Sequence, residues 1–133
     1  APFRHNPRLS QLLCHASWRA HVSGLLRNRL HWLPVAQRVQ YKLCLLVFKA
    51  VRGMAPVYLS ELCRPVADDA ARSRLRSAAH GDLEVPRCTT NFGHRAFAVA
   101  GPKAWNSLPS VLRSSSSIDT YKTHLKTYLF ATC

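Results

Sequence analysis

One stretch constrains the fold of this chain more than any other: residues 30–56, LHWLPVAQRVQYKLCLLVFKAVRGMAP. It combines a helix start, a helix stop and unbroken helical periodicity. Pro34 suits the first helical position, where its missing N–H costs nothing. Gly53 then supplies a left-handed stop, and Pro56 prevents the helix from continuing. These residues predict one helix of about five turns.

The predicted helix is apolar around most of its surface. One set of apolar residues recurs at helical spacing: Val35, Val39, Leu43, Leu46, Val47 and Ala50. A second set widens this surface in the later half: Cys44, Leu45, Phe48 and Val51. Such a pattern is typical of a buried helix. We therefore expect the rest of the domain to surround this helix almost completely.

The charged residues of this helix all have the same sign. They are separated by four, seven and three positions, and we call them the basic ridge: Arg38, Lys42, Lys49 and Arg52. At about 100° per residue they share one narrow strip of surface with Leu45. A solvated face beside a core face explains such a strip, and so does a surface that follows phosphates. The sequence leaves both interpretations open.

Three blocks of sequence carry a family resemblance. LHWLPVAQRVQYKLCLLVFKAVRGMAPVYLSELC is followed by LRSAAHGDLEVPR and by FGHRAFAVAGPKAWNSLPSVLR. In this order and spacing they resemble the tail that follows the reverse-transcriptase domain in LINE-type (non-LTR) retrotransposon polyproteins. The similarity covers about Leu26 to Phe130. It implies a non-catalytic region that helps a reverse-transcriptase domain, supplied elsewhere, to hold its RNA template or target DNA.

Composition and charge fit this expectation. The 133 residues are 47% hydrophobic and 19% charged, which suits one globular domain. The net charge of +13 favours polyanionic partners such as nucleic acid or an anionic membrane. Residues 1–60 carry nine basic and no acidic side chains, whereas residues 67–133 carry nine basic and five acidic ones. The first half is therefore the candidate for binding a polyanion.

Membrane insertion and secretion are not expected. The chain begins APFRHNPRLSQLLCHASW, without the uninterrupted apolar run of a signal sequence. No later run approaches the roughly 20 apolar residues of a transmembrane helix. The cysteines are odd in number and widely spaced, at Cys14, Cys44, Cys63, Cys88 and Cys133. We expect reduced thiols in an intracellular protein, nuclear or cytoplasmic.

The chain before and after the long helix divides into weaker elements. Residues 1–25 are poorly defined, with a short amphipathic helix from Ser10 to about Val22 as one option. Residues 26–131 form the predicted single helical domain. Within it, Pro56 opens a short helical turn that pairs with the long helix and ends at Pro65. Residues 64–81 are small, polar and basic, and we expect an exposed connection.

The last third predicts strands and then a helix. Leu83 with Val85, and Phe97 with Val99, alternate like two short strands around a turn at 91–93. Gly101-Pro102 is expected to interrupt the chain before an apolar block that contains Trp105 and Leu108. Ser117 then caps a helix from Ile118 to about Ala131, with Ile118, Tyr121, Leu125, Tyr128 and Leu129 inward and Lys122, His124 and Lys126 outward. The expected fold class is mainly α: a long central helix, a C-terminal helix and room for one short β-hairpin.

Catalytic and metal sites are not predicted. Asp68-Asp69 resembles the paired carboxylates of polymerases, but it lies among alanines and arginines without a third carboxylate strand. An exposed acidic loop, or a cap for the following turn, explains the pair better. His80, Cys88, His94 and Cys63 lack the close ligand pairs of a zinc site. No nucleophile elbow or phosphate loop is present. We therefore expect no enzyme activity, metal or cofactor.

Binding is the remaining kind of function. The expected nucleic-acid site comprises the basic ridge and three further arginines: Arg38, Lys42, Lys49, Arg52, Arg72, Arg74 and Arg76. Trp18, Trp32 and Trp105 are of a type that stacks on bases, but core packing is the preferred interpretation for the latter two. Contact with RNA or DNA would be electrostatic and non-specific. The alternative is a structural remnant, or a protein-interaction fragment, of a decayed transposon copy without independent activity.

Overall fold

The computed structural model describes residue 24, residues 27–28 and residues 30–132. The chain divides into two compact units, residues 1–34 and residues 35–133, so the division falls at the start of the long helix. In the first unit, residues 24, 27, 28 and 30 are helical. The predicted helix from Ser10 to Val22, and Trp18 within it, lie outside the described residues.

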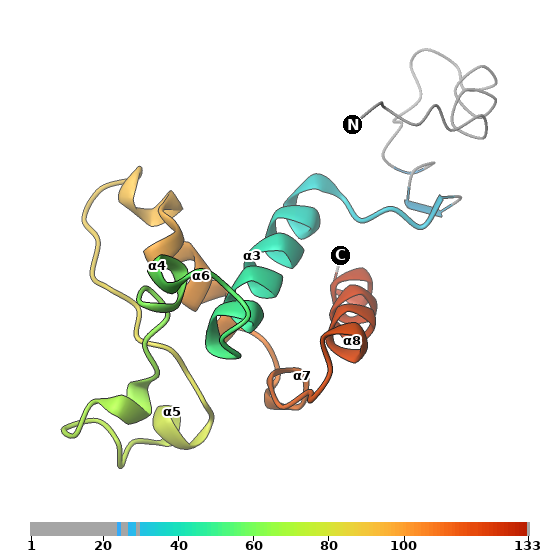
Figure 1. Ribbon diagram of the computed structural model, residues 1–133. Helices are drawn as coiled ribbons and strands as arrows, with labels where there is room; N and C mark the ends of the chain where they lie inside the picture. The colour runs from blue at the N-terminus through green and yellow to red at the C-terminus, as the bar shows by residue number, and fades with distance from the viewer. Residues whose placement is uncertain (1–23, 25–26, 29, 133) are drawn as a thin grey trace. The chain divides into compact units, whose positions relative to one another are not determined.

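The predicted long helix is present as α3, Val35–Val51, in the second unit (Figure 1). Pro34 immediately precedes it, and Gly53 follows it with a φ of 70°. The Met54 N–H donates to the Lys49 carbonyl at 2.8 Å, and the Gly53 N–H donates to the Ala50 carbonyl. This pair of bonds is a Schellman motif, which needs a left-handed residue at the glycine position. The predicted stop is confirmed.

The remaining elements of the second unit are short except for two helices (Figure 1). In chain order they are α4 Val57–Ser60, η1 Val66–Asp68, α5 Arg76–Ala79, η2 Gly93–Arg95, α6 Phe97–Asn106, α7 Ser110–Arg113 and α8 Ile118–Ala131. The prediction of a mainly α fold is confirmed. The short helical turn after Pro56 is also present, and the Ser60 hydroxyl ties it to α3 by donating to the Ala50 carbonyl at 3.2 Å.

The predicted β-hairpin is wrong. Residues 30–132 contain no strand, and Leu83 makes only an isolated bridge with Pro65. Phe97 and Val99 belong to α6, which continues through Gly101-Pro102 rather than being interrupted there. A Cβ atom at Gly101 would lie 3.1 Å from a methyl of Val47. Close packing of α6 on α3 therefore decides this segment, and two alternating positions are too short a pattern to oppose it.

Three aromatic rings form the centre of the core, where α3 packs against α6 and α8. The Phe48 ring stacks on Tyr121 at 4.2 Å between centroids, and Trp105 lies 6.5 Å from Phe48. The Tyr121 hydroxyl donates to the Cys44 carbonyl at 3.2 Å. Burial raises the pKa of the Cys44 thiol to about 12 and also raises the pKa of Tyr121. Cys44 is thus a core residue, as predicted.

The long helix is less enclosed than its sequence predicts. Its second half buries Cys44, Val47, Phe48 and Ala50, but Val35 is 69% exposed and Val39 is 55% exposed. Helices α6 and α8 lie against one part of its circumference, and other apolar positions face outward. The expectation of an almost surrounded helix is therefore wrong.

The C-terminal helix follows the prediction closely. α8 begins after Ser117, whose hydroxyl accepts a hydrogen bond from the Asp119 N–H at 3.3 Å. Its inner face is buried at Tyr121, Leu125 and Leu129, with Ile118 and Tyr128 half-buried. Among the residues that the structure describes, no helix has the length and apolar character needed to cross a membrane.

Candidate nucleic-acid interface

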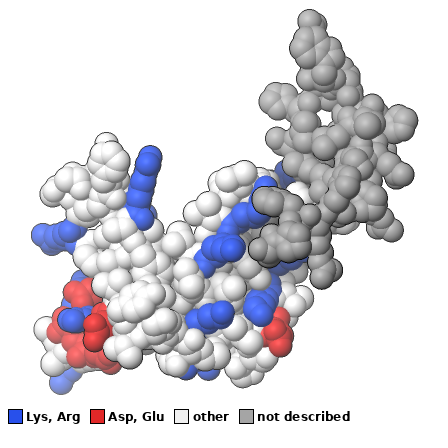
Figure 2. All heavy atoms as spheres, turned by 45° about the horizontal axis from the view of Figure 1, so that its top comes forward, with Lys and Arg blue, Asp and Glu red and all other residues white. Residues whose placement is uncertain are grey.

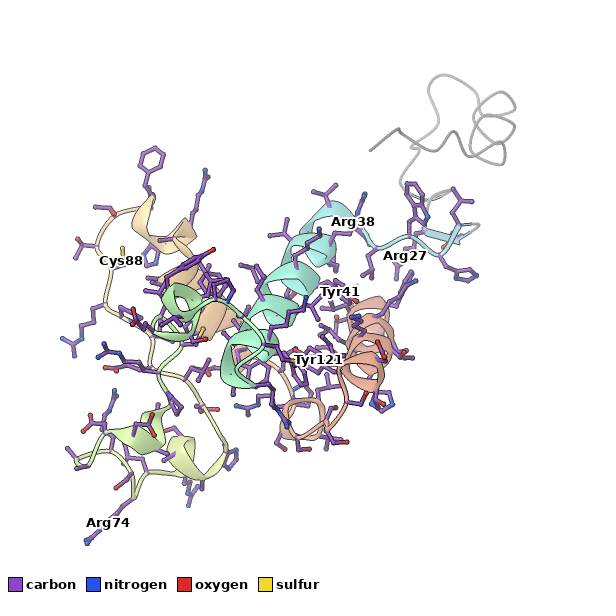
Figure 3. The ribbon with its side chains drawn as sticks, in the orientation of Figure 1. Arg27, Arg38, Tyr41, Arg74, Cys88 and Tyr121 are labelled. Atoms are coloured by element: carbon purple, nitrogen blue, oxygen red, sulfur yellow. The ribbon has the colours of Figure 1, made fainter. Side chains whose placement is uncertain are left out.

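The basic ridge lies along α3 and the turn after it. Arg38, Lys42 and Arg52 are exposed, and Lys49 is half-buried. Figure 3 labels Arg38 in the first turns of the helix, and Figure 2 shows Lys and Arg side chains gathered over the side of the unit formed by α3 and α8. The structure therefore brings the four ridge residues onto one surface, as their spacing requires.

Arg52 has a structural role within the unit. Its Nη2 atom donates to the Ser115 carbonyl at 2.6 Å, which joins the end of α3 to the chain between α7 and α8. Its guanidinium carbon also lies 5.2 Å from the centroid of the Phe48 ring, within cation–π range. Arg52 therefore helps to hold the fold together in addition to carrying one of the ridge charges.

Two further lysines lie on α8. Lys126 is exposed and Lys122 is half-buried, on a helix that packs directly against α3. The Lys122 ammonium lies 3.4 Å from Asp119, a solvent-exposed ion pair of the kind that contributes little energy. The sequence placed both lysines on the outer face of α8, but it could not show that this helix adjoins the ridge.

The loop arginines lie elsewhere in the unit. Arg72, Arg74 and Arg76 are exposed on the connection that was predicted to be exposed, and Figure 3 shows Arg74 at the opposite end of the unit from Arg38. Residues 64–84 also carry four carboxylates, which equal the four arginines of the same segment: Asp68, Asp69, Asp82 and Glu84. Figure 2 shows acidic and basic side chains intermixed there. The loop arginines are thus separate from the ridge and locally balanced in charge.

Side chains from α6 and α7 hold the end of this loop in place. The Asn106 amide donates to the Leu83 carbonyl and accepts from the Leu83 N–H, both at 2.8 Å. The Trp105 indole N–H donates to the Gly81 carbonyl at 3.3 Å. The largely buried Arg113 guanidinium pairs with the Asp82 carboxylate. Trp105 is therefore a core and anchoring residue, as predicted, and its ring is not available for stacking on bases.

The prediction for Trp32 is wrong. Core packing was expected, but the side chain is 40% exposed, whereas the adjacent Leu33 is buried. A run of apolar residues in the sequence indicates that one of them is buried, but it does not indicate which one. Here the buried side chain is that of Leu33 rather than that of Trp32.

The candidate metal and catalytic residues do not form a site. Asp69 accepts a hydrogen bond from the Ala71 N–H at 3.0 Å, so this acidic pair lies in an exposed, locally capped turn, as predicted. Within residues 30–132, no three His, Cys, Asp or Glu side chains converge to hold a metal ion. Burial raises the pKa of the Cys63 thiol, which makes a nucleophilic thiolate less accessible.

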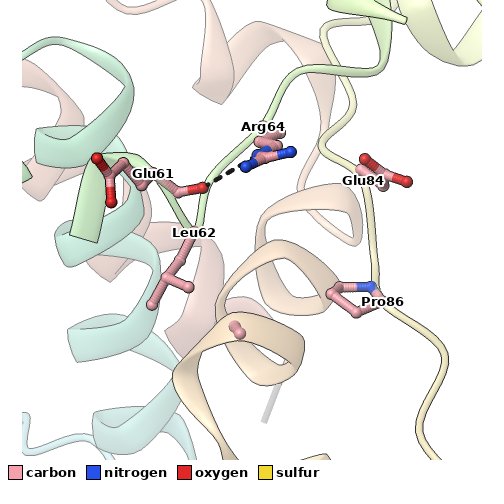
Figure 4. A pocket seen from close by; sticks show the side chains of 6 residues that line it. Glu61, Leu62, Arg64, Glu84 and Pro86 are labelled. Carbon is pink, nitrogen blue, oxygen red and sulfur yellow. Dashed lines mark hydrogen bonds between the residues drawn. The ribbon is translucent and has the colours of Figure 1, made fainter. Parts of the chain in front are cut away.

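A small open hollow of about 270 Å³ lies between the end of α4 and the chain after Leu83 (Figure 4). Its lining is Glu61, Leu62, Arg64, Glu84, Pro86 and Ala98. The Arg64 Nε atom donates to the Glu61 carbonyl at 3.4 Å. The lining contains two carboxylates, Glu61 and Glu84, and one guanidinium, Arg64, but no cysteine, serine or histidine.

Comparisons of the chain with protein-family models, with curated proteins and with solved structures find no match.

Proposed function

We propose that this chain is a non-catalytic module that binds RNA or DNA through their phosphates, on the surface formed by α3 and α8. The contributing side chains are Arg38, Lys42 and Lys49 of the ridge with Lys122 and Lys126 of α8. The observation that carries the proposal is the one-sided charge of α3: residues 35–52 carry four basic and no acidic side chains. A surface helix whose charged residues are all cations is the usual electrostatic footprint of a polyanion site.

The distribution of carboxylates over the second unit supports this choice of surface. Residues 35–133 carry fourteen Lys and Arg against six Asp and Glu, a net charge of +8. Five of the six carboxylates occur within residues 61–84, and Asp119 is the sixth. The positive charge of α3 is therefore not offset by any carboxylate of its own helix, whereas that of residues 61–84 is. A phosphate backbone would release its own counterions on binding to α3, which makes the affinity depend steeply on salt.

The resemblance to the tail of LINE-type polyproteins is consistent with this proposal. It implies action inside the cell, in the nucleus or the cytoplasm, beside a reverse-transcriptase domain that holds the catalytic residues. Contact through phosphates alone would suit such a role, because the module would have to hold a template or target of any nucleotide sequence.

The test is affinity of the full chain for a mixed-sequence single-stranded RNA and for a duplex DNA of equal length, between about 50 and 200 mM salt, with circular dichroism on the same sample. Roughly five phosphate contacts predict a slope of about −4.5 for log affinity against log salt on duplex DNA. Submicromolar binding with such a slope supports the proposal. A helical sample that binds neither polymer at micromolar concentration and the lowest salt overturns it.

A second candidate, a fragment that binds another protein, is favoured by one observation. The end of α3 and the α4 turn expose several apolar side chains: Leu46, Val51, Met54, Val57 and Tyr58. Exposed apolar groups of this kind mark protein interfaces or a lost structural neighbour. Sedimentation distinguishes the candidates: reversible self-association or aggregation at micromolar concentration favours the fragment, and a monomer that binds nucleic acid favours the module.

A further inference from the structure

Phe92 is the most exposed large apolar side chain among the described residues, at 83%. It lies in the turn between the extended chain after Leu83 and helix α6. Figure 3 labels Cys88, at the base of this turn, beyond α6 as seen from α3. This aromatic ring belongs neither to the basic ridge nor to the buried core, so its exposure calls for a separate explanation.

The turn that carries Phe92 is well ordered by hydrogen bonds. The Thr90 hydroxyl accepts from the Gly93 N–H at 3.1 Å, and the Thr90 carbonyl accepts from the His94 N–H at 3.2 Å. The Phe92 carbonyl accepts from the Arg95 N–H at 3.0 Å. A Cβ atom at Gly93 would lie 2.0 Å from the Cys88 sulfur, so glycine is required for this close approach. The ring is thus presented from a fixed backbone, which lowers the entropy cost of using it in binding.

The surroundings of the ring are basic. Arg87, His94 and Arg95 are exposed on the same turn. No Asp or Glu occurs between Glu84 and Asp119, so these cations have no carboxylate neighbour in their own segment. Figure 2 shows basic side chains beside an uncharged projection at the upper left, where the turn lies in Figure 1. A projecting aromatic ring on a turn that also carries cations is a combination that binds single-stranded nucleic acid, with a base on the ring and phosphates on the cations.

We propose that Phe92 stacks on an unpaired base of single-stranded RNA or DNA, while Arg87 and Arg95 contact the flanking phosphates. This inference rests on the proposed function and deepens it. The turn before α6 would bind the bases of single strands, and the surface of α3 and α8 would bind the phosphate backbone. One ring is too small an apolar surface to anchor a protein to a bilayer, whereas stacking requires only one ring. A base-paired duplex offers no free base face to it.

The test compares Phe92→Ala and Phe92→Trp with the wild-type chain. The probes are a single-stranded RNA of mixed sequence containing 2-aminopurine and a duplex DNA of equal length. Phe92→Ala should weaken RNA binding roughly ten-fold and leave duplex binding unchanged, and Phe92→Trp should restore RNA binding. Emission of 2-aminopurine should fall when the wild-type chain binds and fall less with Phe92→Ala. Val111→Ala is the matched control, because Val111 is 76% exposed on α7 and has no assigned role in binding.

The outcomes separate this inference from the proposed function. Wild-type binding to both polymers, with Phe92→Ala losing affinity for neither or equally for both, overturns the stacking role and leaves the module intact. Absence of wild-type binding to either polymer overturns both. If Phe92→Ala instead loses binding to vesicles of phosphatidylcholine and phosphatidylserine while keeping RNA affinity, the ring belongs to a lipid surface and the stacking role is wrong.

Discussion

Residues 35–52 and residues 64–84 carry the same number of basic side chains in very different settings. Each has four, but the first segment has no carboxylate and the second has four. From the sequence alone, both segments are candidate phosphate sites, because both contain the same number of basic residues. The structure adds that the two segments lie apart (Figure 1), so the loop carboxylates lie beside the loop arginines and Arg113 rather than beside the ridge. The local balance of charge, rather than the number of cations, identifies the better polyanion surface.

The two segments also differ in what holds them. α3 is fixed by aromatic rings packed against its inner face, whereas the loop is fixed at its end by side-chain hydrogen bonds from α6 and α7. A helix packed on a core holds its outer charged side chains in constant positions, whereas a loop that is fixed only at its end holds them less rigidly. Changes to each support should therefore have different consequences for the fold.

The largest expected effect comes from removing the support of α3. Phe48→Ala deletes a fully buried ring that contacts Tyr121 and Trp105, and it should lower the free energy of unfolding by about 3–5 kcal/mol. Urea denaturation followed by circular dichroism measures this. Val39→Ala on the same helix is the control, because its side chain is 55% exposed and should cost far less. Similar losses for both variants would contradict the assignment of the core.

A smaller effect is expected from releasing the loop. Asn106→Ala leaves the N–H and C=O of the buried Leu83 without their amide partner, which should cost about 1–3 kcal/mol. Hydrogen exchange should accelerate at residues 81–84 while the amides of α3 stay protected. Ser107→Ala, at the adjacent exposed position, is the control. Equal acceleration throughout α3 and α8 would mean that the loop is an integral part of the core rather than a tethered segment.

The smallest expected effect tests the difference in charge between α3 and the loop. Asp68→Asn with Asp69→Asn changes the charge of residues 64–84 from zero to +2, and the new amide oxygen at position 69 can still accept from the Ala71 N–H. Affinity for duplex DNA at low salt should rise roughly two- to five-fold, because the loop arginines lose their compensation. An unchanged affinity would show that the carboxylates do not mask these arginines.

Local sequence features predicted the elements that depend on local chemistry. The Gly53 stop of α3 and the Ser117 cap of α8 follow from backbone conformation and capping, which neighbouring residues determine. The segment around Phe97 was assigned wrongly because its helix depends on contact between Gly101 and Val47, which are distant in sequence. The incomplete cover of α3 also depends on where other helices pack.

The candidate site divides in the same way. The spacing of the basic ridge along α3 could be predicted, because one helix fixes it. The addition of Lys122 and Lys126 could not, since it depends on α8 lying beside α3. Phe92 was missed although its turn was expected, because sequence alone does not show that the ring projects outward. The relation to LINE-type polyproteins stays a prediction.

Two matched variants test whether α3, rather than the loop, supplies the polyanion surface. One carries Gln at positions 38, 42 and 49, and the other carries Gln at positions 72, 74 and 76, so each removes three positive charges. Duplex DNA affinity is measured for both across about 50–200 mM salt. We expect the α3 variant to lose on the order of 100-fold in affinity at about 0.1 M salt and about two to three units of salt slope, and the loop variant to change less than about three-fold. Equal losses in the two variants, or a larger loss in the loop variant, would contradict this expectation.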